Sequence, residues 1–220
     1  TVLADPQARA LYLFPTKALA QDQLKGLRRF LPPGKEEDGV RFVAGTYDGD
    51  TPADARRRLR DGANLLLTNP DMLHSGILAN HPRWAEFFAN LRYVVLDEIH
   101  VYRGIFGSHV ANVLHRLRRV CRHHGADPLW ICSSATIANP AELAGRLTAG
   151  LSFRTVDGDG SPRGTKHFVL WNPPRLGPVG MERRSANHDA RELLVQLLRD
   201  GYQAIAFVKT RAMTEVLLRD

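Results

Sequence analysis

The run Tyr93-Val94-Val95-Leu96-Asp97-Glu98-Ile99-His100 joins four consecutive hydrophobic residues to two adjacent carboxylates. Its hydrophobic part does not alternate with polar residues, which is typical of a strand that is covered on both faces of its sheet. Such strands occur in parallel sheets, because the connections between parallel strands place helices on the faces of the sheet. The run therefore predicts a buried parallel strand that ends in an acidic loop.

Similar hydrophobic runs recur along the chain, and segments of helical length separate them. We expect the strands of the fold to be Ala10–Phe14, Val40–Ala44, Asn64–Leu67, Tyr93–Leu96, Leu129–Cys132, His167–Trp171 and Ala204–Val208. Hydrophobic residues at helical spacing predict helices over Lys17–Phe30 and Val110–Val120. The alternation of strands and helices predicts an α/β fold.

Turn-forming residues are concentrated in the later part of the chain, over Asp157–Gly164 and Asn172–Pro178. Domain boundaries usually fall in such segments, so we expect a change of domain between about Gly150 and Gly180. The predicted organisation is a first domain over residues 1–150, a linking segment with the first strand of the next domain over 151–180, and the start of that domain over 181–220.

The bulk composition restricts the class of protein. The 220 residues are 44% hydrophobic, which is enough for a buried core without disulfides or metals. The two cysteines, Cys121 and Cys132, do not have the spacing of a zinc or redox site, and we expect them to be reduced. No hydrophobic run reaches membrane-spanning length, and Thr1–Asp5 lacks the pattern of a signal peptide. We therefore expect a cytoplasmic protein that has no contact with a membrane.

The formal charge of +7 and the pI near 9.8 favour a polyanionic partner, because neutralising phosphates releases counterions. A solvated arginine-rich face accounts for the same excess of positive charge, so the charge alone does not distinguish the two interpretations.

Polar segments follow the predicted strands at the point where each strand ends. Ligands bind at the carboxyl ends of strands in open α/β sheets, so these segments form one candidate site. They are Pro15–Lys17, Thr68–Asp71, Asp97–His100, Ser133–Thr136 and Lys209–Arg211. Adjacent carboxylates such as Asp97 and Glu98 suit phosphoryl transfer, in which one holds a hydrated Mg²⁺ and the other deprotonates an attacking water. The alternative is an acidic turn that caps the next helix.

Taken together, these segments resemble the motifs of superfamily 2 DExH-box helicases in order and spacing. The correspondence is Pro15–Gln23 with motif Ia, Thr68–Leu73 with motif Ib, Asp97–His100 with motif II, Ser134–Thr136 with motif III and Ala206–Arg211 with motif IV. The resemblance implies a RecA-like parallel sheet with helices on both faces, followed by the start of a second RecA-like domain. It also implies an ATP hydrolase that uses ATP and Mg²⁺ and binds nucleic acid.

Three further segments carry a narrower resemblance, namely Tyr47–Pro52, Tyr102–Val110 and Asp159–Gly164. They are similar to the bacterial mitomycin-repair helicases, which have a C-terminal cysteine-rich domain, and to their fungal relatives of the RecQ-four-like group. This resemblance implies a 3′-to-5′ translocase on single-stranded DNA with a role in DNA repair. It does not indicate a protein partner.

Roles for single residues also follow from the resemblance. Asp97 would coordinate Mg²⁺ through water, Glu98 would act as the general base, and His100, Ser134 and Thr136 would couple the nucleotide site to the nucleic-acid groove. The alternative for Ser134 and Thr136 is a helix N-cap ahead of Asn139. The residues that would grip the backbone of a single strand are Thr16, Lys17, Gly49, Thr68, Asn69, Lys209, Thr210 and Arg211.

Other polar and aromatic residues have a simpler interpretation. Tyr47, Tyr102 and Trp84 have rings that could stack on bases, but packing within the protein is the favoured prediction. The adjacent His123 and His124 could be metal ligands, although a solvated helix end is favoured.

The sequence also departs from the helicase pattern. It contains no Gly-x-x-x-x-Gly-Lys-Ser/Thr phosphate loop and no motif V or VI, so we expect a fragment of a longer ATP-dependent helicase that does not hydrolyse ATP by itself. Two alternatives remain: an ATP-driven translocase that does not unwind DNA, and a non-catalytic nucleic-acid-binding module. The presence of both Asp97 and Glu98 argues against the module, because a binding module does not need a water-activating carboxylate.

Overall fold

The computed structural model describes residues 5–30, 42–162, 164–176 and 182–219, and for residues 216–219 only the backbone. It divides into two compact units, Thr1–Gly158 and Asp159–Asp220. The strands of the first unit are β1 (Arg9–Leu13), β2 (Ala44–Thr46), β3 (Leu65–Thr68), β4 (Leu91–Leu96) and β5 (Leu129–Cys132). Its helices are α1 (Lys17–Leu27), α2 (Ala53–Gly62), α3 (Pro70–Met72), η1 (Leu73–Ile77), η2 (Leu78–Trp84), α4 (Ala85–Ala89), η3 (Ile99–Val101), α5 (Gly104–His123) and α6 (Pro140–Leu147).

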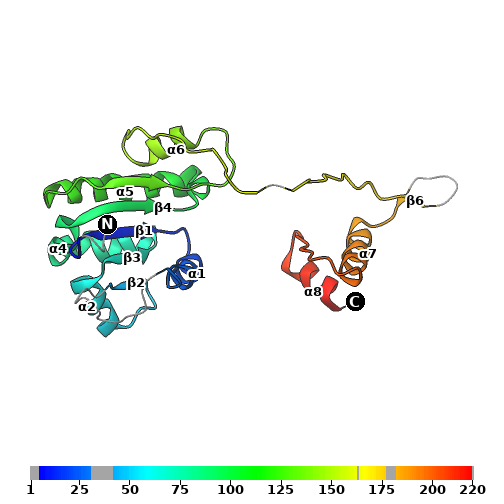
Figure 1. Ribbon diagram of the computed structural model, residues 1–220, viewed down its shortest axis with the longest axis horizontal. Helices are drawn as coiled ribbons and strands as arrows, with labels where there is room; N and C mark the ends of the chain where they lie inside the picture. Colours follow the sequence, from blue (N-terminus) through cyan, green and yellow to red (C-terminus); the bar gives the residue numbers. More distant parts are fainter. Residues whose placement is uncertain (1–4, 31–41, 163, 177–181, 220) are drawn as a thin grey trace. The chain divides into compact units, whose positions relative to one another are not determined.

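The five strands form one parallel sheet in the order β2-β3-β1-β4-β5 (Figure 1). Parallel neighbours need crossover connections, and the helices between the strands provide them. The sheet and its covering helices confirm the predicted α/β, RecA-like fold.

Helices pack on both faces of the central strand β1. Leu11 and Leu13 belong to the larger hydrophobic core, which also contains Leu114 and Leu117 of α5. On the opposite face, Phe14 packs with Ala20 and Leu24 of α1 in a second cluster. Leu11 and Leu13 are buried on one face of β1, and Tyr12 is half-buried against the second cluster on the other, so both faces of the strand are covered.

The strand boundaries differ from the predicted ones mainly at the second strand. We expected Val40–Ala44, but the structure pairs Ala44–Thr46 with Leu65–Leu67, and residues 40 and 41 lie outside the described part of the chain. The predicted bounds of this strand were therefore wrong. Hydrophobicity alone did not locate this strand, because its bounds depend on the backbone hydrogen bonds that β3 offers.

The edge strand β5 is covered on one face only. Trp130 is 8% exposed, whereas Leu129 is 60% and Ile131 is 44% exposed. The prediction of strands covered on both faces is thus correct for β1 and wrong for β5. A hydrophobic run does not reveal whether its strand lies at the centre or at the edge of the sheet.

The second unit contains β6 (Arg175–Leu176), β7 (Glu182–Arg183), α7 (Ala186–Arg199) and α8 (Arg211–Arg219). The strands predicted at His167–Trp171 and Ala204–Val208 do not form, and Phe168 and Phe207 are exposed. A strand needs a hydrogen-bonded neighbour, and the described residues of this unit provide none for these two segments.

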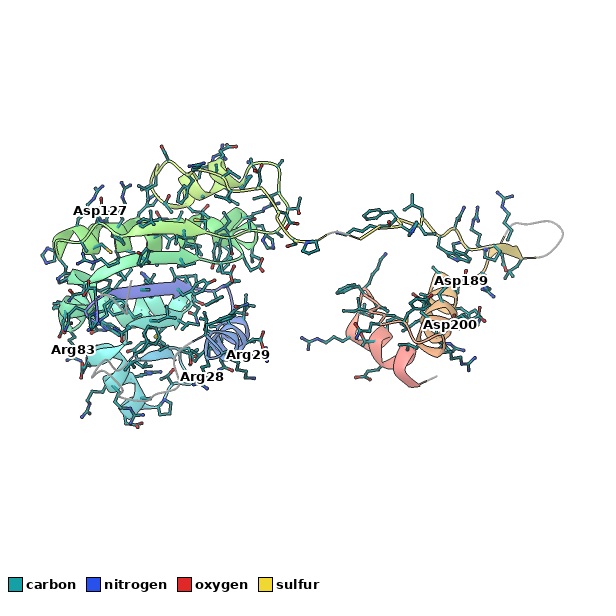
Figure 2. All side chains as sticks on the ribbon, viewed as in Figure 1. Arg28, Arg29, Arg83, Asp127, Asp189 and Asp200 are labelled. Atoms are coloured by element: carbon teal, nitrogen blue, oxygen red, sulfur yellow. The ribbon has the colours of Figure 1, made fainter. Side chains whose placement is uncertain are left out.

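One buried carboxylate organises the start of α7. Asp189 lies on α7, where Figure 2 labels it, and its side chain accepts a hydrogen bond of 2.7 Å from the indole of Trp171 and another from the Arg184 guanidinium. The Trp171 hydrogen bond, followed by the contact with Arg184, lowers the pKa of Asp189 below its usual value. These contacts hold the segment around Trp171 to the helix.

Both cysteines are free, as the sequence predicts. Burial raises the pKa of Cys121 and that of Cys132 to about 12, so both remain thiols near neutral pH. Within the described ranges, none of the helices is sufficiently long and hydrophobic to cross a membrane.

Substitution of Gly107 by alanine is expected to destabilise the first unit by about 1–3 kcal/mol, as is typical of overpacking. A Cβ atom at this position would lie 2.4 Å from the carbonyl oxygen of Tyr102, which is backbone and therefore cannot rotate away. Urea unfolding followed by tryptophan fluorescence measures the change in the free energy of unfolding.

The matched control is Gly26→Ala in α1, where a Cβ atom would meet nothing within 4 Å. This substitution should leave stability unchanged or raise it by up to about 1 kcal/mol, because alanine restricts the unfolded chain. Equal stability changes for the two variants would contradict the close approach at Gly107.

Candidate functional site

The loops that follow the parallel strands meet at one edge of the sheet. Backbone hydrogen bonds join them, from Phe14 N to Thr68 O (3.0 Å), from Asp97 N to Leu13 O (2.9 Å) and from Ser133 N to Leu96 O (2.9 Å). Four of the five predicted polar segments therefore lie side by side, as expected for the carboxyl ends of parallel strands. The fifth, Lys209–Arg211, belongs to the second unit.

Asp97 is the first residue after β4, and the backbone fixes its carboxylate. Its Oδ1 atom accepts a hydrogen bond of 3.0 Å from the Glu98 amide and another from the Ser133 hydroxyl. Ser133 follows β5 directly, in the position opposite Asp97. The Asp97 carboxylate thus connects the ends of two adjacent strands.

Glu98 has an unusual backbone conformation, with φ 52° and ψ 42°. This left-handed region is disfavoured for residues other than glycine, and such residues are enriched at functional sites. The chain therefore turns at Glu98, two residues after the end of β4. The Glu98 carboxylate lies 3.1 Å from Nδ1 of His100.

His100 connects the acidic loop to the segment after β5. Its Nδ1 atom lies 3.1 Å from Glu98 Oε2 and also 3.1 Å from the Ala135 amide nitrogen. This nitrogen can accept from the Ala135 amide or donate to the Glu98 carboxylate, but it cannot do both at once. The tautomer and charge of His100 therefore decide which of the two loops it bonds to.

Ser134 and Thr136 are exposed, and among the described residues their side chains make no hydrogen bond or ion pair. The alternative that they cap a helix is wrong, because α6 begins after Asn139. Their coupling role stays a prediction. The hydroxyl that contacts Asp97 is that of Ser133, which the strand register identifies, since Leu96 pairs with Cys132.

Beneath the acidic loop the protein is nonpolar. Tyr102 is 1% exposed, and its hydroxyl has no hydrogen-bond partner among the described residues. Burial, together with the nearby Asp97 and Cys132, raises the pKa of Tyr102 far above its usual value. Tyr102, Tyr47 and Trp84 are all buried, which confirms the prediction that they pack within the protein.

Three of the predicted nucleic-acid contacts lie together near the start of α1. The Thr16 hydroxyl accepts from the Leu19 amide (3.3 Å) and caps this helix. The Lys17 ammonium forms an ion pair of 3.0 Å with Asp50, and a Cβ atom at Gly49 would lie 3.3 Å from the same ammonium. Lys17 and Gly49 thus lie side by side on the surface, with the lysine paired to Asp50.

Two other predicted contacts are buried. The Thr68 hydroxyl is 2.6 Å from the Tyr47 carbonyl oxygen, to which it donates, and the residue is 1% exposed. Asn69 is 8% exposed, and its side chain caps α3 by accepting from the Met72 amide (2.8 Å). Both side chains hold the loops in place, so any contact they make with a ligand would have to go through the backbone.

The remaining predicted contacts are in the second unit. Lys209, Thr210 and Arg211 are exposed, and the Thr210 hydroxyl accepts from the Met213 amide (3.3 Å) at the start of α8. They form a separate group from the residues of the first unit.

Comparison with known proteins finds relatives of this chain among helicases. Residues 2–143 match the family model of the DEAD/DEAH box helicase. The ATP-dependent helicase YprA of Bacillus subtilis is 49% identical over 99% of this chain and 28% of its own length. HRQ1 of Saccharomyces cerevisiae is 39% identical over 100% of this chain and 20% of its own length.

A solved structure of the DUF1998 helicase MrfA bound to DNA has a TM-score of 0.92 and 48% identity, over 99% of this chain and 28% of that one. The chain thus spans roughly a quarter of the length of these proteins. The similarity to HRQ1 and MrfA confirms the narrower resemblance to the mitomycin-repair helicases and their fungal relatives. The family model covers well over half of the sequence, and the chain therefore belongs to the DEAD/DEAH box helicase family.

Proposed function

We propose that this chain is part of an ATP-dependent DNA helicase that moves 3′-to-5′ along single-stranded DNA and acts in DNA repair. The observation that carries the proposal is the carboxylate pair Asp97 and Glu98 at the end of β4, bonded to the next strand end through Ser133 and His100. A motor needs a site that hydrolyses ATP and contacts that pass a change at this site to the surface that binds DNA. The carboxylate pair suits hydrolysis, and its hydrogen bonds to the adjacent strand end suit the transmission. The similarity to MrfA, a helicase solved with DNA and AMPPNP, supports DNA and ATP as the two ligands.

In this function Glu98 is the general base. Its carboxylate is half-buried and lies beside His100, from which it can accept a hydrogen bond when Nδ1 carries the proton. An attacking water that donates to this carboxylate would be oriented and deprotonated by it. The two carboxylates have different contacts, since Asp97 accepts from Ser133 and the Glu98 amide while Glu98 lies beside His100, so they can have different tasks.

Asp97 and Ser133 fit a magnesium site, because carboxylate and hydroxyl oxygens are ligands that this hard cation prefers. Asp97 would hold the ion through water, as the resemblance implies. Bound Mg²⁺ would neutralise the charge of the ATP phosphates. The hydrogen bonds from Glu98 N and Ser133 Oγ hold the Asp97 carboxylate in one orientation.

Coupling between the two sites would pass through the contacts across the strand ends. Ser133 bonds Asp97 to the segment after β5. His100 can bond through Nδ1 either to Glu98 or to the Ala135 amide, so a change at Glu98 would alter the contact with Ala135. Ser134 and Thr136 follow Ser133 in this segment and are exposed. Their predicted coupling role needs them to be accessible in this way.

Lys17 would contact the phosphates of the single strand, with Thr16 and Gly49 beside it and the backbones of Thr68 and Asn69 in support. Such contacts do not read the sequence of the bases. In the second unit, Lys209, Thr210 and Arg211 would contact nucleic acid as part of a second RecA-like domain over residues 181–220, with 151–180 as the link to a first domain over 1–150.

Replacing Lys17 by glutamine should weaken the binding of single-stranded DNA, and replacing Asp50 by asparagine should strengthen it. Asp50 is the ion-pair partner that competes with a phosphate for the lysine, at 3.0 Å. Both side chains are largely exposed, so each change should be up to about fivefold, the usual range for exposed pairs. Lys17→Gln should also reduce the slope of log affinity against log salt concentration by about one.

Fluorescence anisotropy with a labelled oligonucleotide at several salt concentrations measures both quantities. Lys25→Gln is the matched control, because Lys25 has the same charge in the last turn of the same helix. Equal losses for Lys17→Gln and Lys25→Gln would show that Lys17 contributes only net charge.

Unwinding of a 3′-tailed duplex with ATP tests the proposed function in the protein that contains this chain. Strand separation that needs hydrolysable ATP is expected. ATP turnover with displacement of a triplex strand but no unwinding would indicate a translocase, and binding of DNA without ATP turnover would indicate a binding module.

We also propose that the protein acts in the cytoplasm. Both of its cysteines are free, which is the common state in a reducing compartment.

A further inference from the structure

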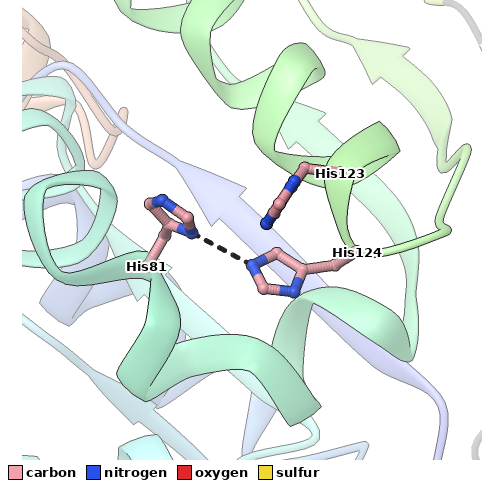
Figure 3. Close-up of side chains that lie close together, drawn as sticks. All are labelled: His81, His123 and His124. Atoms are coloured by element: carbon pink, nitrogen blue, oxygen red, sulfur yellow. Dashed lines mark hydrogen bonds between the residues drawn. The ribbon is translucent and has the colours of Figure 1, made fainter.

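Three histidines from distant parts of the sequence meet on the first unit, away from the acidic loop. His81 belongs to η2, His123 is the last residue of α5, and His124 caps that helix (Figure 3). One nitrogen from each of the three rings lies within 4.8 Å of the others. The shortest of these separations joins His81 Nδ1 to His124 Nε2, at 3.1 Å.

We propose that His81, His123 and His124 form a binding site for a divalent transition-metal ion of the zinc class. In a tetrahedral zinc site with bonds of about 2.0–2.1 Å to nitrogen, the ligand nitrogens are about 3.3 Å apart. Two of the three nitrogens already have nearly this separation. A metal ion would replace the hydrogen bond between them and draw in the third ring.

The surroundings hold two of the ligands in place. The ring of His124 stacks on Phe88, with an interplanar angle of 11° and centroids 5.7 Å apart. The start of η2 is tied to α5 by a hydrogen bond of 3.1 Å from Arg116 to the Leu78 carbonyl oxygen. Histidines whose positions are set by the fold lose little freedom when they bind an ion.

The third ligand is free to adjust. His123 is exposed, so its side chain can rotate over the remaining distance without disturbing the core. His81 and His123 line a shallow pocket of about 290 Å³ together with Arg116, Arg119 and Val120. This pocket leaves a fourth coordination position open to water or to an anion, and the two arginines favour an anion.

The ligand chemistry selects the metal. Imidazole nitrogens suit Zn²⁺, Co²⁺, Ni²⁺ and Cu²⁺, whereas Mg²⁺ and Ca²⁺ prefer oxygen ligands. In the part of the chain that is described, the cluster includes no carboxylate. The site is therefore distinct in selectivity from the magnesium site proposed at Asp97.

Binding would cross-link two segments that begin at different strand ends. η2 follows the loop after β3, and α5 follows the acidic loop after β4. A metal ion between them would stabilise the folded state, because the three assembled imidazoles bind it more tightly than the unfolded chain does.

The test uses the purified chain with any histidine tag removed, and Zn²⁺ and Co²⁺ as probes. Equilibrium dialysis should find one tightly bound Zn²⁺ per chain, and thermal unfolding should shift to higher temperature with Zn²⁺ but not with Mg²⁺. Bound Co²⁺ should show the intense visible absorption of a four-coordinate ion. Absence of a stoichiometric site in the wild-type chain would overturn the proposal.

Variants assign the ligands. His123→Asn should keep the fold, because the side chain is exposed, and should reduce Zn²⁺ affinity at least about tenfold, as should His81→Asn. His109→Asn is the matched control, since His109 is an exposed histidine on the same helix outside the cluster. Unchanged Zn²⁺ affinity in His123→Asn, or an equal loss in His109→Asn, would contradict the assignment.

Discussion

Replacement of Glu98 by glutamine is expected to lower ATP hydrolysis by about a hundredfold or more in the helicase that contains this chain. The amide has nearly the same shape as the carboxylate and can still hydrogen-bond to His100, which lies 3.1 Å away. It cannot accept a proton from the attacking water. ATP binding should therefore persist while turnover is lost, and steady-state hydrolysis together with a nucleotide-binding titration measures the two effects separately.

The Glu98→Gln variant should still bind single-stranded DNA. Because ATP would remain bound, the protein should hold single-stranded DNA at least as tightly as the wild type in the presence of ATP, and it should fail to unwind a tailed duplex. Asp97→Asn should differ by weakening Mg²⁺-dependent nucleotide binding itself, since it removes charge that faces the metal.

The control for the loss of charge is Glu86→Gln in α4, where the carboxylate is 70% exposed and lies outside the acidic loop. Its ATPase activity should remain close to that of the wild type. Near-normal hydrolysis by Glu98→Gln would mean that Asp97–His100 is not the hydrolytic motif.

Truncation of Trp84 to alanine is expected to destabilise the first unit by about 3–5 kcal/mol, the usual range for a large buried aromatic side chain. Trp84 is 2% exposed and packs edge-to-face against Tyr47 and Phe87, with ring centroids 5.0 Å and 5.7 Å away. Its removal would leave a cavity beneath the loop that contains Gly49. Chemical unfolding measures the loss.

Phe106→Ala is the control, because Phe106 is 42% exposed and its truncation should lower the free energy of unfolding by much less than that of Trp84.

The measurement of stability and DNA affinity together also separates packing of Trp84 from base stacking. If Trp84 stacked on bases, its truncation would lower DNA affinity and leave the free energy of unfolding nearly unchanged.

The positions of four of the five strands in the sheet of the first unit could be predicted, because burial demands hydrophobic residues. The run Leu129–Cys132 coincides with β5, and the predicted bounds of the strands at β1 and β3 each differ by one residue from the observed ones. The same reasoning failed at His167–Trp171 and Ala204–Val208. A hydrophobic run indicates that a segment favours a sheet, but a strand forms only beside a partner strand that offers backbone hydrogen bonds.

The candidate site was predictable to a similar degree. The order of strand-end segments identifies Asp97 and Glu98, because parallel strands bring their carboxyl ends to one edge. The choice between Ser133 and Ser134 was not predictable from that order, since it depends on the pairing of Leu96 with Cys132. Thr68 and Asn69 have polar side chains that the sequence predicts to bind a ligand, but the fold uses them to bond to Tyr47 and Met72.

The sequence by itself determined the fold class, the acidic loop and the membership of a helicase family, because these depend on residue types in a fixed order along the chain. Only the tertiary structure decided which side chains touch. Ser133 meets Asp97 across 36 residues, and His81 meets His124 across 43. Contacts of this kind arise from strand register and helix packing, in which a shift of one residue turns a side chain to another face, so no local pattern encodes them.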